Sequence, residues 1–378
     1  MTIYENQNKG VQYVPRILFI MPLPPPVHGS AMVSQQIKDG KLIGDTFCCD
    51  WVNLSTSRGM DEIGRRNPIK IWRFLSSLFA TFGKLLTHRY ALCYLAITCH
   101  GGGFLKDAPF VLLCKLFRRK IVIHQHNKGM SADVERWPYS WLLPLVYRNA
   151  KVILLSWHLY PDIERIVKKE QVLICPNGIP QTNTDIIVRN HEVPHLLFLS
   201  NLIISKGVYV LLDACKILKD KGSEFVCDFV GGETTEIDGE MFNFEVNHRG
   251  LGTRVIYYGR KYGADKERFF SDADIFVFPT YYNNECFPLV LLEAMQFQLP
   301  IVTTNEGGIP DVVQDGVNGI ICERQNAESL AAAIEQLLLN PALRRQMGQK
   351  GYEIFKQKFT LEKFEHRMCE ILFKTIAE

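Results

Sequence analysis

The residues DIFVFPTYYNNECFPLVLLEAMQFQLPIVTTNEGGIPDVVQDGVNG, at positions 274–319, show most clearly how this chain folds. The apolar run 275–279 predicts a buried strand, and a polar loop separates it from a helical segment with Pro288 at or near its first turn. A second apolar run, 300–304, leads into the glycine-rich sequence 304–311. Strand, helix and strand in this order predict a parallel sheet with loops at the carboxyl ends of its strands.

The same alternation of short apolar runs and helical segments fills the chain outside this stretch. One series of apolar runs occupies 16–22, 46–52, 91–98, 120–126, 151–156 and 171–175, and a second occupies 195–200, 225–230, 254–258, 275–279 and 300–304. Residues 176–194 lie between the two series and have the composition of a linker. The sequence therefore predicts an α/β protein of two doubly wound, Rossmann-like domains, residues 1–180 and 181–359.

The C-terminal part of the chain is predicted to be helical. After Asn326 two helical segments are separated at Asn340-Pro341, and Thr360 is placed to cap a last helix through Ala377. This last helix, at about 360–378, could pack back on the first domain.

Composition argues against several classes of protein. Of the 378 residues, 47% are hydrophobic, enough for buried cores. The chain has 43 basic and 40 acidic residues, and its net charge of +3 is too small to indicate nucleic acid as a partner. The eleven cysteines form no C-x-x-C pair, which indicates free thiols in a reducing cytoplasm and no zinc site. No apolar stretch reaches the roughly 18 residues of a membrane span. We expect a cytoplasmic protein, in peripheral contact with the inner face of the cell membrane at most.

The loops that follow the predicted strands 275–279 and 300–304 form the first candidate site. A helix that starts at this edge of a sheet offers backbone N–H groups to phosphate or to sugar hydroxyls. Glu285 on the loop and Glu293 in the helix, with seven residues between them, can approach one ligand from different sides. Acidic residues near a helix start often only complement the helix dipole, but the glycine-rich loop at the same edge favours a binding site.

Six motifs follow one another in this part of the chain. They are Ala273-Asp-Ile-Phe-Val-Phe-Pro, the E-x7-E pair Glu285 and Glu293, Glu293-Ala-Met, Pro300-Ile-Val, Gly307-Gly-Ile-Pro-Asp and Asp315-Gly-Val-Asn-Gly. In this order they resemble the retaining GT-B glycosyltransferases of family 4, the glycosyl transferases group 1. The resemblance implies an enzyme that moves a hexosyl or other glycosyl group from a nucleotide diphosphate sugar to an acceptor hydroxyl, without a metal or another cofactor. It also implies cell-surface polysaccharide or glycolipid synthesis, with a saccharide or a lipid-linked saccharide as acceptor.

The resemblance also implies which residues bind the donor and which take part in catalysis. Glu293 would bind the ribose hydroxyls, and Glu285 would lie by the transferred sugar. The implied donor-binding residues are Gly29, Ser30, Asn201, Lys206, Arg260, Phe287, Pro288, Leu289, Val290 and Glu293, and the implied catalytic residues are His126 and Glu285.

One position departs from the family pattern. Lys206 matches a lysine that holds the diphosphate, but Asn201 takes the place of the family's arginine. The missing positive charge would have to come from Arg260 or Lys261, or donor binding would be weaker.

Two segments of the first domain resemble donor-side loops of the family. Gly29 and Ser30 follow the first strand, in a loop that the resemblance places across the cleft from the donor diphosphate. His126 closes the apolar run 120–126 and matches a histidine that reaches the transferred sugar, although a lone histidine at a strand end is more often structural. His124 is expected to face the opposite side of the strand.

Two further motifs look like sites of other protein classes. His100, Gly101 and Gly102 are similar to the oxyanion loop of lipases, but the chain has no G-x-S-x-G nucleophile elbow, so we place them on the acceptor side of the cleft. Asp272 and Asp274 form a D-x-D, the metal motif of another glycosyltransferase fold. Their place before a strand predicts a helix-end pair at the opposite edge of the sheet, without a metal.

Residues 68–90 are basic and aromatic and predict a helix. The residues at helical spacing that we expect to form its core face are Ile71, Leu75, Leu78, Phe82 and Leu86. The residues left for a possible contact with anionic lipid head groups are Arg65, Arg66, Lys70, Trp72 and Arg73.

Two other functions stay open at this point. A catalytically weak GT-B subunit that binds sugar nucleotides as a scaffold is mildly favoured by Asn201, whereas Glu285, Glu293, Lys206 and His126 argue against it. A nucleotide-sugar epimerase of the same double-Rossmann plan would convert the donor without any acceptor.

Overall fold

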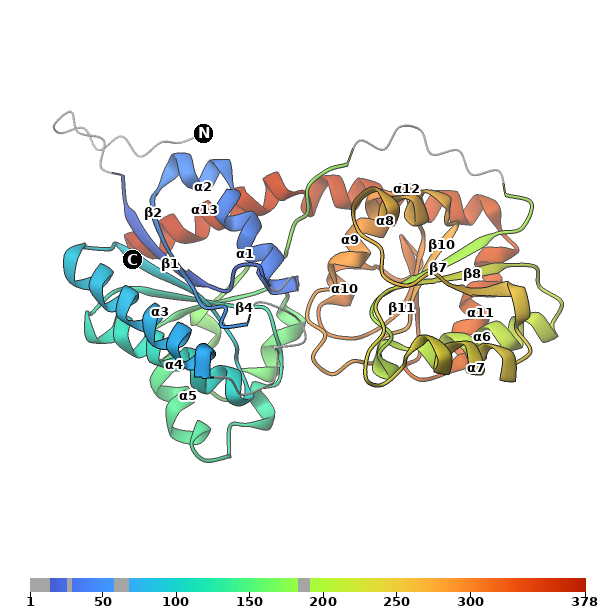
Figure 1. Cartoon of the computed structure of the whole chain (residues 1–378). Helices are drawn as coiled ribbons and strands as arrows, with labels where there is room; N and C mark the ends of the chain where they lie inside the picture. The colour runs from blue at the N-terminus through green and yellow to red at the C-terminus, as the bar shows by residue number, and fades with distance from the viewer. Residues whose placement is uncertain (1–13, 26–28, 58–67, 183–190) are drawn as a thin grey trace.

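The computed structural model describes residues 14–25, 29–57, 68–182 and 191–378, which form two α/β units (Figure 1). Each unit is built on a six-stranded sheet. The first sheet consists of β1 (Arg16–Met21), β2 (Cys48–Asn53), β3 (Leu92–Ile97), β4 (Ile121–Gln125), β5 (Lys151–Leu154) and β6 (Val172–Ile174). The second consists of β7 (His195–Leu199), β8 (Val226–Val230), β9 (Val255–Tyr257), β10 (Ile275–Phe278), β11 (Ile301–Thr304) and β12 (Gly319–Cys322).

All strand pairs in both sheets are parallel. The first sheet has the order β2-β1-β3-β4-β5-β6 and the second the order β12-β11-β10-β7-β8-β9. In each sheet the chain first adds strands on one side of its first strand and then on the other side. The reversal lies between β1 and β3 in the first sheet and between β7 and β10 in the second. Open α/β sheets bind ligands at such a reversal, outside the carboxyl ends of the strands.

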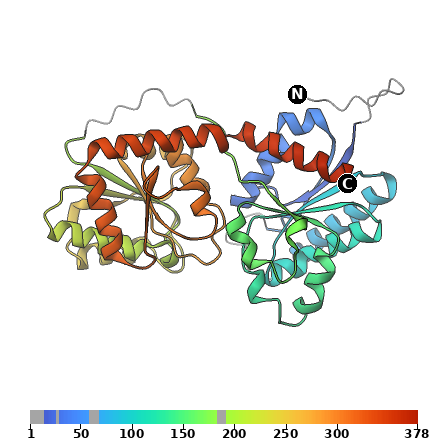
Figure 2. The ribbon, with the colours of Figure 1, turned by 180° about the vertical axis from the view of Figure 1, so that it is seen from behind.

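Helices cover both faces of each sheet (Figures 1 and 2). On the first sheet, α1 (Gly29–Asp39), α2 (Lys41–Thr46) and α13 (Leu361–Ala377) cover one face, and α3 (Pro68–Thr87), α4 (Gly101–Leu116) and α5 (Tyr139–Tyr147) cover the other. On the second sheet, α6 (Val208–Asp220), α7 (Gly239–His248) and α11 (Ala327–Leu338) cover one face, and α8 (Gly263–Asp272), α9 (Leu289–Gln296) and α12 (Pro341–Lys358) cover the other. The short α10 (Ile309–Val312) lies between β11 and β12.

Alternate residues of each strand pack on opposite faces of the sheet, which explains why most strand residues are apolar. Leu18 and Ile20 of β1 join the core under α3, α4 and α5, whereas Ile17 and Phe19 join the core under α1, α2 and α13. A polar residue on a parallel strand covered on both sides loses contact with water and needs a hydrogen-bond partner inside the protein. The predicted fold class, two doubly wound units, is confirmed by this architecture.

The last helix returns from the second unit to the first (Figure 2). The side chain of Thr360 caps α13 by accepting a hydrogen bond from the N–H of Lys363. Phe364 and Leu372 of α13 are completely buried in the core that covers one face of the first sheet. Just before α13 the two chain crossings between the units meet, because Ile179 donates to the carbonyl of Phe359 at 3.0 Å and accepts from the N–H of residue 361 at 2.8 Å.

The predicted strands are all present, to within two residues at either end, and the second sheet has one strand more than predicted. This extra strand, β12, contains only the four residues GIIC, too few to show a periodic pattern, and it follows directly on the Asp315 turn. It lies at the edge of the sheet beside β11.

The expected core face of α3 is wrong for four of its five residues. Leu78 does pack against the core, together with Phe74, Thr81 and Leu85. The exposed members of the expected stripe are Ile71, Leu75, Phe82 and Leu86. The helix is apolar around more than half of its circumference, so spacing alone does not decide which side faces the sheet. Arg65 and Arg66 lie outside the described residues.

Two expected features can be checked on the described part of the chain. None of its helices is both long and apolar enough to cross a bilayer. Asp272 and Asp274 lie at the end of α8 and just before β10, at the amino edge of the second sheet, where the Asp274 carboxylate accepts a hydrogen bond from the His195 N–H at 2.9 Å.

Replacing Leu372 by alanine should destabilise the first unit, although Leu372 lies on the last helix of the chain. Truncation of a fully buried leucine leaves a cavity, and it lowers the free energy of unfolding by about 2–5 kcal/mol. Urea unfolding followed by tryptophan fluorescence measures this, because all five tryptophans are in the first unit: Trp51, Trp72, Trp137, Trp141 and Trp157.

The matched control is Leu339→Ala, which truncates an exposed leucine at the end of α11. It should change the free energy of unfolding by less than about 0.5 kcal/mol. Equal effects of the two substitutions would contradict the contribution of α13 to the first unit.

Candidate functional site

The centre of the candidate site is an ion pair at the strand reversal of the second sheet. Lys206 comes from the loop after β7, and Glu285 comes from the loop after β10. The Lys206 ammonium donates to the Glu285 carboxylate, and the two side chains are only 14% and 9% exposed. The ammonium also lies 5.4 Å from the centre of the Phe278 ring and 4.6 Å from that of Tyr282. A lysine enclosed in this way is a strong cation for an anionic ligand, because little water screens it.

The Lys206 loop is held against the Glu285 loop by a glycine. Gly207 has a φ of +87°, and a Cβ at this position would lie 2.3 Å from the carbonyl oxygen of Pro279. The N–H of Tyr281 donates to the carbonyl of Ser205 at 2.8 Å. The backbone contacts therefore set the position from which Lys206 reaches Glu285.

A second glycine holds the other side of the Glu285 loop. Gly307 has a φ of +53°, and a Cβ there would lie 2.1 Å from the carbonyl oxygen of Glu285. The next residue, Gly308, donates its N–H to the carbonyl of Cys286 at 2.7 Å. The glycine-rich loop after β11 thus supports the loop after β10.

Glu293 lies in the middle of α9 and is paired with another lysine. Its carboxylate accepts from the Lys266 ammonium at 2.5 Å, and both side chains are about a quarter exposed. The two glutamates of the E-x7-E pair are therefore neutralised separately, Glu285 by Lys206 and Glu293 by Lys266. Lys266 is a residue of this site that the sequence patterns did not single out.

The remaining residues expected at the donor side lie around these pairs. The helix α9 begins at Leu289, so Leu289 and Val290 are in its first turn and Pro288, which has no N–H, immediately precedes it. Phe287 is buried, and its ring lies 5.8 Å from that of Phe359.

Asn201 and Arg260 meet at a glycine of the second unit. The Asn201 side chain accepts a hydrogen bond from the N–H of Gly232 at 3.3 Å. The Arg260 guanidinium packs on the same residue, since a Cβ at Gly232 would lie 2.2 Å from its Nη2 atom. Arg260 and Asn201 therefore lie on either side of the same glycine.

The first unit contributes a cavity of about 270 Å³ at the carboxyl edge of its sheet. Gly29 starts α1, and the next residue, Ser30, lines the cavity together with His126. The other hydroxyl and charged residues of its wall are Ser55, Thr56, Ser57, Thr98, Lys106 and Asp107. The lining is thus rich in groups that form hydrogen bonds with sugar hydroxyls.

The two histidines at the end of β4 do not face opposite sides, so that expectation is wrong. The ring centres of His124 and His126 are 4.0 Å apart, because residues two apart in a strand point to the same side. His124 is completely buried and shares a hydrogen bond of 2.6 Å with the Tyr94 hydroxyl. Burial, together with the neighbouring His126, holds the pKa of His124 well below its usual value, so this imidazole is neutral.

The triglycine segment expected on the acceptor side does not line this cavity. The N–H of Gly101 donates to Asp133 at 2.7 Å, and the His100 ring packs against Gly129. Gly101 and Gly102 form the first turn of α4. The cavity is lined instead by Lys106 and Asp107, in the second turn of this helix.

Asp107 is a buried wall residue that the sequence patterns did not single out. Its carboxylate accepts from the N–H of Thr98 at 3.0 Å and lies 3.3 Å from the Lys106 ammonium. Burial raises the pKa of Asp107. Its signal in the sequence is weak but present, because Asp107 is the one acidic residue of the apolar helix α4.

A charged contact joins the two units beside the site. Lys128 follows His126 in the first unit, and its ammonium lies 2.8 Å from the Glu306 carboxylate of the second. Glu306 is buried and also pairs with Arg324 at 2.7 Å. This contact brings the loops after β4 and β11 together.

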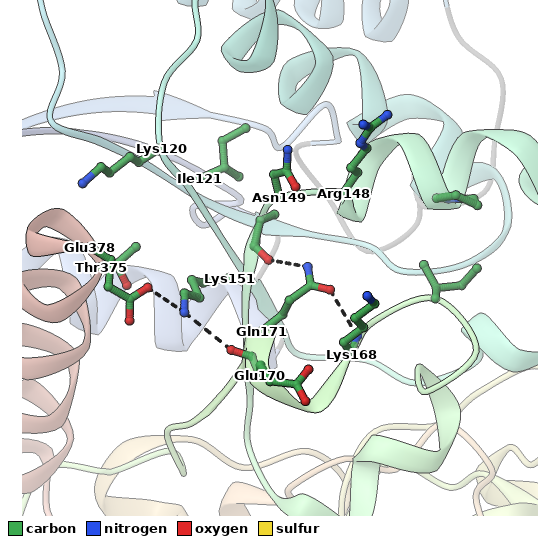
Figure 3. Close-up of a pocket in the computed structure, with 13 residues that line it drawn as sticks. Lys120, Ile121, Arg148, Asn149, Lys151, Lys168, Glu170, Gln171, Thr375 and Glu378 are labelled. Atoms are coloured by element: carbon green, nitrogen blue, oxygen red, sulfur yellow. Dashed lines mark hydrogen bonds and ion pairs between the residues drawn. The ribbon is translucent and has the colours of Figure 1, made fainter.

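A larger recess, of about 700 Å³, lies at the other end of the first sheet (Figure 3). Its polar side chains bond largely to one another and to the backbone: Lys151 pairs with Glu378 at 2.6 Å, and Gln171 donates to the carbonyl of Ala150 at 2.8 Å. The recess is at the amino ends of β4 and β5, away from Lys206, Glu285 and His126. It is not part of the candidate site.

Comparison with known proteins agrees with this geometry. Residues 181–354 match the family "Glycosyl transferases group 1". An uncharacterized glycosyltransferase of Methanocaldococcus jannaschii is 28% identical over 56% of each chain. The capsular polysaccharide biosynthesis glycosyltransferase CapM of Staphylococcus aureus is 29% identical over 43% of this chain and 41% of its own. The chain spans about half the length of the curated relatives it matches.

Solved structures resemble almost the whole chain. Sucrose-phosphate synthase from Thermosynechococcus elongatus has a TM-score of 0.72 at 18% identity, over 96% of this chain and 99% of that one. Anabaena HepE, solved in complex with UDP and glucose, has a TM-score of 0.68 at 17% identity, over 95% of this chain and 99% of that one. These likenesses concern the fold. Residues 181–354 therefore match the glycosyl transferases group 1, and the chain as a whole has the GT-B fold.

Proposed function

We propose that this protein is a retaining glycosyltransferase of family 4, which moves a sugar from a nucleotide diphosphate sugar to an acceptor hydroxyl in cell-surface polysaccharide or glycolipid synthesis. The observation that carries the proposal is the enclosed Lys206–Glu285 pair at the strand reversal of the second sheet. The family match of residues 181–354, the relative that serves capsular polysaccharide biosynthesis and the similar fold of a UDP-binding protein support it.

The donor would be bound mainly by the second unit. Its diphosphate would compete with Glu285 for the Lys206 ammonium, and the first turn of α9 would add backbone N–H groups. Arg260 would supply the second positive charge that Asn201 lacks. Glu293 would accept the ribose hydroxyls, and Lys266 would hold its carboxylate in place.

Transfer would take place where the two units meet. Gly29 and Ser30 at the start of α1 would approach the diphosphate from the first unit, and His126 would approach the transferred sugar. In a same-face displacement the leaving phosphate takes the acceptor proton, so this mechanism needs no separate base. Closure of the units, with Lys128 bound to Glu306, would exclude water and align the acceptor.

The acceptor would lie in the 270 Å³ cavity of the first unit. Its hydroxyl side chains suit a saccharide, and the Lys106–Asp107 pair offers a donor and an acceptor of hydrogen bonds side by side. His126 is part of the same wall, so a sugar bound there would have a hydroxyl near the transferred group.

A scaffold subunit that binds sugar nucleotides without turnover is the second candidate, because Asn201 stands where the family has an arginine. Consumption of the donor in the presence of an acceptor distinguishes an enzyme from such a subunit. An epimerase of the same plan would convert the donor when no acceptor is added.

Replacing Glu293 by alanine should impair nucleotide binding, whereas replacing Glu285 by alanine should impair turnover. Glu293→Ala removes a charged acceptor to the ribose hydroxyls, so nucleotide binding should weaken by about 1.5–3 kcal/mol. Glu285→Ala should not weaken nucleotide binding, because it removes the group that competes with the diphosphate for Lys206, and it should lower turnover instead, since Glu285 would lie by the transferred sugar. Calorimetry with nucleoside diphosphate and steady-state kinetics measure the two effects.

The matched control is Glu353→Ala, which removes an exposed carboxylate of α12 that is paired with Lys350. It should change neither measurement. The proposal is wrong if the Glu285 and Glu293 variants are folded, bind nucleotide normally and transfer sugar at wild-type rates. The two carboxylates would then only complement the dipole of α9.

Transfer should survive removal of divalent metals. The positive charge that we assign to the diphosphate comes from Lys206, Arg260 and a helix start, and the only D-x-D in the sequence lies at the amino edge of the sheet. Activity in EDTA should therefore stay close to that of the untreated protein. Complete loss of transfer that manganese restores would refute this account of the phosphate site, whereas mild stimulation by divalent ions would not.

A further inference from the structure

The loop after β11 and the short helix α10 lie on the side of the second unit that faces the first (Figure 1). Two acidic side chains of this segment pair with residues of the first unit. The Glu306 carboxylate lies 2.8 Å from the Lys128 ammonium, and the Asp311 carboxylate lies 3.6 Å from Nε2 of His158. This segment therefore joins the two units through two charged contacts.

The same segment supports the loop that carries Glu285. A Cβ at Gly307 would lie 2.1 Å from the carbonyl oxygen of Glu285, and the Gly308 N–H donates to the carbonyl of Cys286 at 2.7 Å. Gly308 also approaches the first unit, since a Cβ there would lie 2.9 Å from the Cβ of Ser156. Such close contacts transmit a displacement from one backbone to the next. A shift of the loop after β11 would therefore shift Glu285.

Both partners of the Lys128–Glu306 pair are held in place within their own units. The backbone N–H groups of the two residues that follow Lys128 donate to the Asp162 carboxylate at 2.9 and 3.0 Å. Glu306 is only 4% exposed and also binds Arg324 of its own unit at 2.7 Å. The pair thus connects two fixed loops, and it sets the distance between them.

We propose that Glu306 is a positioning residue, which places Glu285 in its working position while Lys128 of the first unit is bound to it. When the units separate, the loop after β11 loses this partner, and the Glu285 loop loses its support. The consequence for transfer rests on the proposed function, because the site by the transferred sugar would be complete only when closure excludes water. The coupling itself can be measured without a substrate.

Cys286 reports on the contact between the units. It follows Glu285 directly and is 5% exposed. Burial and the neighbouring Glu285 carboxylate raise the pKa of its thiol, whereas the Lys128 ammonium of the first unit lowers it. Separation of the units should hydrate this thiol and speed its reaction with a thiol reagent, which needs the thiolate. Cys215 and Cys227, completely buried in the core of the second unit, report on unfolding instead.

Lys128→Met should raise the rate at which N-ethylmaleimide modifies Cys286 in the free full chain by about tenfold or more, because a charge-assisted bond to a buried carboxylate is lost. Glu306→Gln should have the same effect. The two substitutions together should have no more effect than either alone, since both remove one pair. Peptide mapping by mass spectrometry gives the rate at each cysteine, and the rates at Cys215 and Cys227 should not change.

The matched control is Arg324→Met, which removes the other cation bound to Glu306, one that comes from the second unit itself. It should change the rate at Cys286 by less than about threefold, because Arg324 is 54% exposed. Lys128→Arg should keep the protection of the wild type, since it keeps the positive charge. If Arg324→Met acts as strongly as Lys128→Met, the effect comes from the charge of Glu306 and not from the contact between the units, and the proposal is wrong.

Kinetics separate the positioning role from a purely structural one. Lys128→Met should lower kcat about tenfold or more and leave nucleotide affinity unchanged, because the diphosphate would be bound by Lys206 of the second unit. Faster modification of Cys286 with an unchanged kcat would overturn the proposal, as would equal modification rates in wild type and Lys128→Met, or modification of Cys215 together with Cys286. A wild type without transfer activity would refute the proposed function, whereas the modification rates would still decide whether Lys128 and Glu306 hold the units together.

Discussion

The candidate site depends on close contact between backbones at the carboxyl edge of the second sheet. The loops after β7, β10 and β11 approach so closely at Gly207 and Gly307 that no side chain fits between them. Both residues also have a left-handed backbone conformation, which other residues adopt only with strain. Because these contacts involve the main chain, the position of Lys206 and Glu285 is set by the fold of the loops rather than by the flexible side chains themselves.

Both glutamates of the site are held in ion pairs. Each glutamate of the E-x7-E pair already has a lysine partner in the free protein, so neither carboxylate is an unpaired charge in a partly buried environment. An anionic donor that bound the Lys206 ammonium would take the place of Glu285 in this pair.

The sequence was sufficient for the fold and for the central loops, because both depend on short-range patterns. Strands buried on two faces are mostly apolar, and the motifs from Ala273 to Gly319 occupy one continuous stretch of chain. The residues that could not be predicted depend on contacts between distant segments. Lys128 meets Glu306 only because two loops of different units face each other, and Lys266 reaches Glu293 from another helix.

The orientation of α3 and the place of His124 show two further limits of sequence patterns. A helix that is apolar on most sides has no single amphipathic direction, and its contact with the sheet is decided by which residues fit, here Phe74, Thr81 and Leu85. His124 and His126 are two residues apart, and their rings pack against each other at the end of β4. The expectation was wrong because residues two apart in a strand point to the same side. The glycines at the start of α4 stand out in the sequence but do not line the cavity of the first unit, whereas Asp107 further along the helix lines it and does not stand out.

The return of α13 to the first sheet has a consequence for the order in which the protein can fold. A ribosome makes residues 14–182 first, yet Phe364 and Leu372, which complete one face of their core, are made only after the whole second unit. Until then Ile17 and Phe19 have no cover from α13, and the newly made first unit exposes apolar surface of the kind that chaperones recognise. Domains usually fold in the order of synthesis. Here the second unit can complete its fold before the first, because the first unit is complete only when α13 has packed on it.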